Sequence, residues 1–219
     1  MKTTKILALC LIINVLLGFE IVVVAGNIHV GYRYYQNGGW PPPNGVAADI
    51  KTINKDVPYG SNFYTQSVCV WLSVTQGYWL QVGYYKGIYE SYTLKWYIEK
   101  KDSSGVPCHY WQTKTPTAGT TYHYYLDHTD GTSKWKCGVD GQFNRDITPS
   151  PYTARNYEAM SEMTTNLQVI DGTYYKYLYY AQGTDWNFWN THYPVNEDPT
   201  VYTLTELYHY SFEADGGGE

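Results

Sequence analysis

The sequence has few charged residues. They make up 16% of its 219 positions, whereas an ordinary globular domain has roughly 25%. Lysine and arginine number 15 against 20 aspartates and glutamates, which gives a formal net charge of −5 at pH 7. We expect no nucleic-acid partner, because phosphate binding needs a clustered basic surface. Intrinsic disorder is also excluded, since a chain with this little charge and 18% aromatic residues can bury a core.

Long apolar runs are confined to the N-terminus. Two lysines precede the apolar stretch 6–18, and a second short run ends at Ala25. This pattern predicts a secretory signal peptide over residues 1–25, so we expect a secreted, extracellular protein. The alternative is a membrane anchor, because about 20 residues up to Ala25 could span a bilayer. Glu20 favours cleavage, since a charge inside a bilayer is costly, and no stable membrane insertion is expected afterwards.

Cysteine is scarce as well, with four in the whole chain. Removal of the signal peptide would take Cys10 and leave Cys69, Cys108 and Cys137. An odd number allows at most one internal disulfide. Cys108 and Cys137 flank loop-like segments and are the preferred pair. Cys69 lies in an apolar run and is predicted to be a buried free thiol.

Sustained helical periodicity is missing too. Instead, short runs alternate with period two and are separated by glycine, proline, asparagine and aspartate. The 26 tyrosines and eight tryptophans also favour strands. About a dozen strands are predicted, among them 153–164 and a last strand at 200–212. Residues 26–219 are therefore expected to form a single all-β domain, a two-sheet antiparallel sandwich or a barrel.

Common catalytic motifs are absent. The chain has no Gly-x-Ser-x-Gly, no phosphate-binding glycine loop, no Cys-x-x-Cys and no His-Glu-x-x-His. His123 and Asp127 share a strand face but lie about 13 Å apart, too far for one ion. The loop 140–146 misses the EF-hand spacing. We therefore expect no metal and no cofactor.

Two polar residues stand out because they lie in the middle of apolar strands. Gln81 shares a strand face with Trp79 and Tyr85, and Glu158 shares one with Glu162. A buried amide or carboxylate needs hydrogen-bond partners or a groove. The two glutamates would lie about 13 Å apart along the strand, farther than the carboxylate pair of a glycosidase. The pattern therefore favours a sheet-lined cleft that contains Gln81 and Glu158.

These segments resemble the glutamic peptidases, the eqolisin family and its plant relative neprosin. Leu80-Gln81-Val82-Gly83 resembles the strand that carries the family's catalytic glutamine, which is a glutamate in neprosin. The run from Glu158 to Glu162 resembles the strand of the catalytic glutamate. The resemblance covers roughly residues 66–165 and implies a concanavalin-like β-sandwich of jelly-roll type that hydrolyses peptide bonds. It implies catalytic roles for Gln81 and Glu158, and Trp79, Tyr85 and Glu162 would then bind a polypeptide substrate.

The chain departs from the family pattern at two points. The eqolisin run Trp-Tyr-Glu-Trp is represented by Trp96-Tyr97-Ile98-Glu99, which displaces the glutamate by one position and is expected to put it on the other face. Ala159 replaces the tryptophan that follows the catalytic glutamate. The alternative function is a non-catalytic module, secreted or at the cell surface, that binds polysaccharide or self-assembles. Its aromatic platform would come from residues 174–180 or 186–189.

Overall fold

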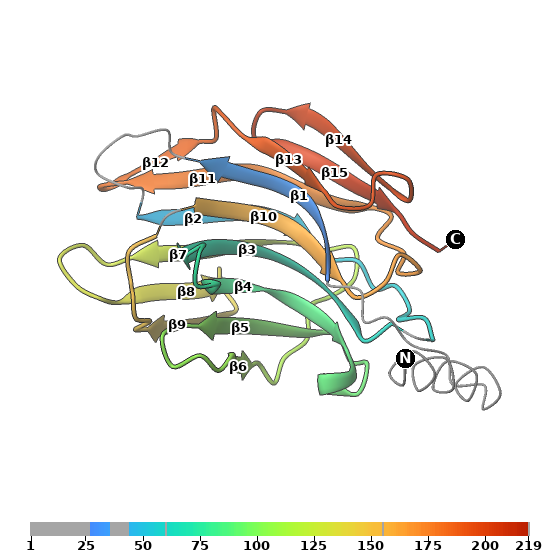
Figure 1. Ribbon diagram of the computed structural model, residues 1–219, viewed down its shortest axis with the longest axis horizontal. Coiled ribbons are helices and arrows are strands. Elements are labelled where there is room, and N and C mark those ends of the chain that lie inside the picture. Colours follow the sequence, from blue (N-terminus) through green and yellow to red (C-terminus); the bar gives the residue numbers. More distant parts are fainter. Residues whose placement is uncertain (1–26, 36–43, 60, 155, 219) are drawn as a thin grey trace, which may run out of the picture.

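Two antiparallel sheets lie face to face and form the body of the molecule (Figure 1). The computed structural model describes residues 27–35, 44–59, 61–154 and 156–218. The predicted signal peptide lies outside the described residues. The prediction of a two-sheet antiparallel sandwich is confirmed. No helix in the described part of the chain is long and apolar enough to cross a membrane.

Sheet A has the strand order β13-β1-β10-β3-β4-β5-β6. In chain order its strands are β1 (Ile28–Tyr35), β3 (Phe63–Ser73), β4 (Tyr78–Gly87), β5 (Lys95–Lys101), β6 (Cys108–Trp111), β10 (Asn156–Met163) and β13 (Tyr193–Asn196). A short 3-10 helix, Ile88–Glu90, follows β4.

Sheet B has the order β14-β15-β11-β2-β7-β8-β9, and β12 pairs with β11 beside this path. Its strands are β2 (Gly45–Lys51), β7 (Thr121–His128), β8 (Trp135–Val139), β9 (Phe143–Ile147), β11 (Thr173–Gln182), β12 (Asp185–Phe188), β14 (Tyr202–Tyr208) and β15 (Ser211–Gly216).

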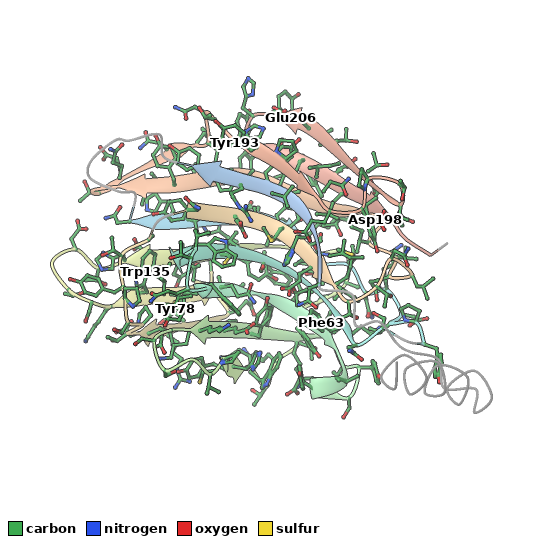
Figure 2. All side chains as sticks on the ribbon, in the orientation of Figure 1. Phe63, Tyr78, Trp135, Tyr193, Asp198 and Glu206 are labelled. Atoms are coloured by element: carbon green, nitrogen blue, oxygen red, sulfur yellow. The ribbon has the colours of Figure 1, made fainter. Side chains whose placement is uncertain are left out.

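The core fills the space between the sheets and follows the period-two pattern of the sequence. On β4 the buried side chains of Leu80, Val82 and Tyr84 belong to this core, and the intervening residues point to the opposite face of sheet A. Large aromatic side chains complete the core, and several of them use their polar atoms in hydrogen bonds. The buried Trp135 (Figure 2), for example, donates from Nε1 to the carbonyl oxygen of Tyr152 at 2.7 Å.

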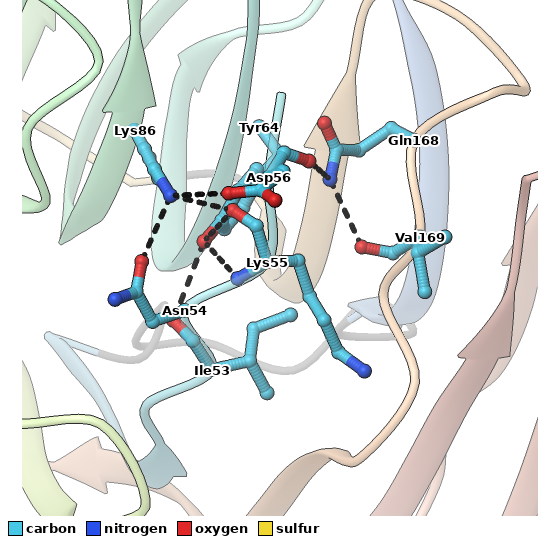
Figure 3. Close-up of polar contacts among 8 residues, drawn as sticks. All are labelled: Ile53, Asn54, Lys55, Asp56, Tyr64, Lys86, Gln168 and Val169. Atoms are coloured by element: carbon cyan, nitrogen blue, oxygen red, sulfur yellow. Dashed lines mark hydrogen bonds and ion pairs between the residues drawn. The ribbon is translucent and has the colours of Figure 1, made fainter. Parts of the chain in front are cut away.

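The connection from β2 to β3 is anchored at one end of the sandwich by polar contacts (Figure 3). Lys86 Nζ donates to Asn54 Oδ1 at 2.9 Å and to the Lys55 carbonyl oxygen at 2.8 Å. Gln168 Nε2 donates to the Asp56 carbonyl oxygen at 3.1 Å from the opposite side. Because β3 follows directly, these bonds fix where the central strand of sheet A begins.

The predicted disulfide is wrong: Cys108 and Cys137 are both free thiols. Cys108 lies on β6 of sheet A, whereas Cys137 lies on β8 of sheet B. Packed sheets are separated by about 10 Å, whereas a disulfide joins Cα atoms less than about 7 Å apart. Cys69 is buried and free, as predicted.

The C-terminal end also differs from the prediction. The expected single strand over 200–212 is a hairpin of β14 and β15, which pair Thr205 with Glu213. The glycines that follow are held by hydrogen bonds: the amide of Gly218 donates to the Asn166 carbonyl oxygen at 3.3 Å. Tyrosine-rich alternation in this segment hid the turn, because Tyr208 and Tyr210 do not mark a turn in the sequence.

Candidate active site

A cavity of about 460 Å³ opens on the face of sheet A that points away from sheet B. We call it the sheet A cavity. Its lining comes from β1, β3, β4, β5, β6 and β10 and from the segments next to them. The lining residues are Asn27, His29, Phe63, Thr65, Cys69, Trp71, Trp79, Gln81, Tyr85, Tyr89, Tyr97, Glu99, Pro107, His109, Trp111, Glu158, Met160 and Glu162. All five residues that the sequence singled out for the site therefore lie in one cavity.

The strand register sets up a row of polar residues across the cavity floor. Glu158 lies opposite Cys69, Cys69 opposite Gln81, and Gln81 opposite Glu99. Arg33 extends the row beyond Glu158. Neighbouring strands are about 4.8 Å apart, so the backbones of Gln81 and Glu158 are separated by about 10 Å. Side chains projecting from both positions reach the same space from its two sides.

Glu158 is a buried carboxylate with a cationic partner. The residue is 1% exposed, and Arg33 Nε donates a hydrogen bond to its Oε1. Burial raises the pKa of Glu158, and the positive charge of Arg33 and a hydrogen bond from Trp71 oppose that rise. The pKa stays above the ordinary value for glutamate. Glu158 can therefore exchange a proton in acidic solution while Arg33 keeps its charged form accessible.

Gln81 is held by a second carboxylate. Its Nε2 donates to Glu99 Oε2 at 2.7 Å, and His109 Nε2 lies 3.4 Å from Glu99 Oε1. The hydrogen bond that His109 donates to Glu99 raises the pKa of His109. A glutamine amide has two N–H donors and a carbonyl oxygen. One donor is bound by Glu99, which orients the amide and leaves its other groups for a molecule in the cavity.

Glu162 lies four residues beyond Glu158 on the same face of β10. Its Oε1 accepts a hydrogen bond from Asn27 Nδ2 and lies 3.8 Å from His29 Nε2. Burial raises the pKa of Glu162, His29 opposes this, and the negative charge of Glu99 adds to the rise. Glu162 and Glu99 therefore act on one another across the cavity.

Aromatic rings form the wall on the β4–β6 side. The ring centroid of Tyr85 lies 5.0 Å from that of Trp111 and 5.6 Å from that of Phe63. Trp79 packs edge-on against Trp71 at 5.9 Å. These contacts hold the rings in place and give the cavity an apolar side next to Gln81. Trp79 and Tyr85 thus line the cavity beside Gln81.

Sequence reasoning missed Arg33, Glu99 and His109. The expectation that the displaced Glu99 faces away from the site is wrong, because Tyr97 and Glu99 line the cavity while Trp96 and Ile98 face the core. The apolar alternation of Trp96 and Ile98 was the signal that could have placed Glu99. Nothing local could have paired Arg33 with Glu158.

Among the described residues, no three histidine, cysteine or acidic side chains are grouped so that they could hold a metal ion. His123 Nδ1 lies 2.6 Å from Asp49 Oδ1, a residue on the neighbouring strand β2. Its side chain is thus engaged with Asp49 rather than with Asp127.

No protein-family model and no curated protein matches this sequence. Solved structures do match its fold. A scytalido-glutamic peptidase with a peptide-based transition state analog superposes with a TM-score of 0.61 at 10% identity, over 87% of this chain and 98% of that one. A second structure of that peptidase, with a transition state analog inhibitor, gives 0.63 at 9% identity over the same shares. SCP-B, a member of the eqolisin family in complex with the tripeptide Ala-Ile-His, gives 0.58 at 8% identity.

These likenesses show a shared fold: the chain is an all-β sandwich built like the glutamic peptidases. The match includes almost the full length of each peptidase chain. The structural resemblance expected from the two short motifs is thereby confirmed.

Proposed function

We propose that this protein is a secreted acid endopeptidase of the glutamic-peptidase type, with Gln81 and Glu158 as its catalytic residues. The observation that carries the proposal is the row across the cavity floor. There the carboxylate of Glu158 and the amide of Gln81 face one cavity from two sides, with Cys69 between them. The fold shared with the peptidases supports it, as does the fit of both motifs.

The first chemical step uses Glu158 as a general base. A water molecule between Glu158 and the peptide carbonyl gives one proton to the carboxylate while its oxygen forms a bond to the carbonyl carbon. The carbonyl oxygen takes the electron pair of the broken π bond and becomes an oxyanion. The free N–H of Gln81 donates a hydrogen bond to that oxyanion, and Glu99 holds the amide in position for it.

The second step uses the same carboxyl group as a general acid. Protonated Glu158 gives its proton to the peptide nitrogen, the C–N bond breaks, and the amine leaves. The oxyanion reforms a carbonyl, and the other product is a carboxylic acid. Glu158 returns to its ionised form, which Arg33 stabilises. No co-reactant other than water is needed.

The decisive experiment is digestion of casein between pH 2 and pH 7 by the wild type and by Glu158→Gln. The wild type should cleave in acid, and Glu158→Gln should lose activity by at least about a thousandfold. The glutamine keeps the shape of the side chain, so circular dichroism should show an unchanged fold. Glu213→Gln, on β15 of sheet B, is the matched control and should retain full activity. Equal cleavage by Glu158→Gln would overturn the assignment.

Secretion is part of the proposal and is supported by the apolar N-terminal sequence. Expression of the full chain in a host with a secretory pathway should release a protein that lacks residues 1–25. Edman degradation of the released protein would identify its first residue. Retention of the full-length chain in the cells would contradict secretion.

We infer a second candidate function, polysaccharide binding, from an aromatic strip on sheet B. Exposed Tyr177, Phe188 and Tyr208 belong to it, and Tyr179 and Tyr210 connect them through ring contacts of 4.4–6.4 Å. Aromatic rings at a protein surface can stack on sugars. The predicted platforms contribute only in part, because Tyr175 and Trp189 are buried in the core. Slower migration in gels that contain a soluble polysaccharide tests this candidate.

A further inference from the structure

The carboxylates of the sheet A cavity are unequally compensated. Glu158 has Arg33 as a permanent cationic partner. Glu99 and Glu162 have amide donors, Gln81 and Asn27, and their only ion-pair partners among the described residues are His109 and His29. A histidine is charged only when protonated, and lysine or arginine is not involved. Near neutral pH these two carboxylates therefore have no permanent positive charge beside them.

The hydroxyl group of Tyr97 is close enough to both carboxylates for their charges to act on it. The negative charges of Glu99 and Glu162 both add to the effect of burial in raising the pKa of Tyr97. Tyr97 is 1% exposed and lines the cavity, and contacts with the hydroxyl groups of Thr65 and Ser67 oppose the rise of its pKa. None of these three hydroxyl groups makes a side-chain hydrogen bond of normal geometry among the described residues. A buried polar group without a well-formed hydrogen bond costs free energy. These three hydroxyl groups contact one another without good hydrogen-bond geometry, which is a second sign, beside the two carboxylates, that a polar group binds here.

The hydroxyl groups of Thr65 and Ser67 come from strand β3, and both residues are buried. Thr65 lies opposite Glu162 in the register, and Ser67 lies opposite Gly83, which is opposite Tyr97. Of these hydroxyl groups, those of Thr65 and Tyr97 belong to residues that line the cavity, as do the carboxylates of Glu99 and Glu162. Such a set accepts hydrogen bonds and attracts positive charge.

The aromatic wall limits what kind of cation fits. Tyr85 lies opposite Thr65 on β4, and its ring packs against Tyr97 with centroids 6.4 Å apart. A cation bound at Glu162 therefore shares the cavity with the rings of Tyr85 and Tyr97. Lysine and arginine combine a long apolar stem with a charged end, which suits such a surface, and the rings add attraction for the charge.

We propose that the part of the sheet A cavity between Glu99 and Glu162 is a subsite for a basic side chain, lysine or arginine, of a peptide. The ammonium or guanidinium group would donate hydrogen bonds to Glu162, Glu99 and the Tyr97 hydroxyl. The inference rests on the proposed function in one respect, namely that the occupant of the cavity is a peptide. The subsite adds the class of substrate, because the hydroxyl groups and the two carboxylates disfavour an apolar side chain at this position.

The test measures binding of blocked hexapeptides that differ only at one position in an alanine host. That position holds either lysine or norleucine, which keeps the aliphatic stem without the charge. Quenching of tryptophan fluorescence at pH 6.5 and 0.15 M salt reports binding, because Trp71, Trp79 and Trp111 line the cavity. Mass spectrometry verifies that the peptides stay intact. The wild type should bind the lysine peptide roughly tenfold more tightly.

Glu162→Gln should lower affinity for the lysine peptide roughly tenfold and leave affinity for the norleucine peptide within about twofold. Glu197→Gln is the matched control. It removes the same charge beside His29, at a residue that contacts His29 but does not line the cavity, and both affinities should stay within about twofold. Equal binding of the two peptides by the wild type would overturn the subsite, and this comparison needs no variant.

The two proposals fail in different ways. A protein that prefers the lysine peptide but cleaves no peptide at any pH would overturn the peptidase function and leave the subsite. A protein that cleaves in acid and binds both hexapeptides equally would overturn the subsite and leave the peptidase function. An unchanged preference for lysine in folded Glu162→Gln would also contradict the subsite.

Discussion

The two faces of sheet A differ completely, although the same strands form both. Toward sheet B, β4 presents Leu80 and Val82, which are fully buried in the core. Toward the cavity it presents Gln81, which is bound to Glu99. Consecutive residues thus serve packing and chemistry in turn, since successive side chains of a strand point to opposite faces. Stability and activity should therefore respond separately to substitutions at neighbouring positions.

The two faces also differ in how they treat polar atoms. In the core, polar side chains such as Trp96 and Gln66 are neutral: Trp96 Nε1 donates to the Tyr124 hydroxyl at 3.1 Å, and Gln66 Oε1 accepts from the Tyr175 hydroxyl at 2.8 Å. On the cavity face, ionisable carboxylates are buried, and burial raises the pKa of Glu158 and of Glu162. Burial of charged groups reduces stability. The cavity face is therefore arranged for a bound molecule at the expense of stability.

The largest expected effect comes from the core face. Leu80→Ala should lower the free energy of unfolding by about 2–5 kcal/mol, because it leaves a cavity at a fully buried position. Urea denaturation followed by tryptophan fluorescence measures this loss. Peptidase activity per folded molecule should stay nearly constant. A large drop in that activity would show that the two faces are coupled.

On the cavity face, Gln81→Ala should reverse this pattern. Loss of the oriented amide should reduce kcat by roughly 10²–10³-fold in acid, as for other removed oxyanion donors. The free energy of unfolding should fall by only about 1 kcal/mol, the usual value of one hydrogen bond. Gln142→Ala, in the exposed turn before β9, is the matched control and should change neither quantity. A loss in stability comparable to that of Leu80→Ala would contradict the separation of the faces.

The sequence predicts this division of faces well. Alternation placed Gln81 with Trp79 and Tyr85, and Glu158 with Glu162, because a strand's period is independent of where the strand lies in the sheet. It could not show which strands are neighbours. Arg33 binds Glu158 only because β1 pairs with β10, and these strands are 125 positions apart in the chain. The disulfide failed for the same reason, since spacing between cysteines does not show that they lie on different sheets.

Arg33→Gln removes the permanent cation that is paired with Glu158. Burial raises the pKa of Glu158, and Arg33 opposes this rise, so removal of the guanidinium should raise the pKa further. The general base works only when ionised, above its pKa. The acidic limb of the pH profile of kcat should therefore move to higher pH by about one unit. The matched control is Lys51→Gln on β2 of sheet B. An unchanged limb would show that Arg33 does not act on the catalytic carboxylate.

The smallest effect is expected on the outer face of sheet B, a third surface that can be compared with the two faces of sheet A. Tyr208 is 66% exposed and contacts Tyr210 with ring centroids 5.8 Å apart. Tyr208→Ala should change the free energy of unfolding by no more than about 0.5 kcal/mol, as is usual for surface positions, and leave cleavage of casein unchanged. Tyr59→Ala removes a still more exposed tyrosine away from the strip and is the control. If the strip binds polysaccharide, Tyr208→Ala alone should lose retardation in polysaccharide gels. Equal retardation of both variants would show that the strip is not the binding surface and would leave the sheet A cavity as the site to which function is assigned.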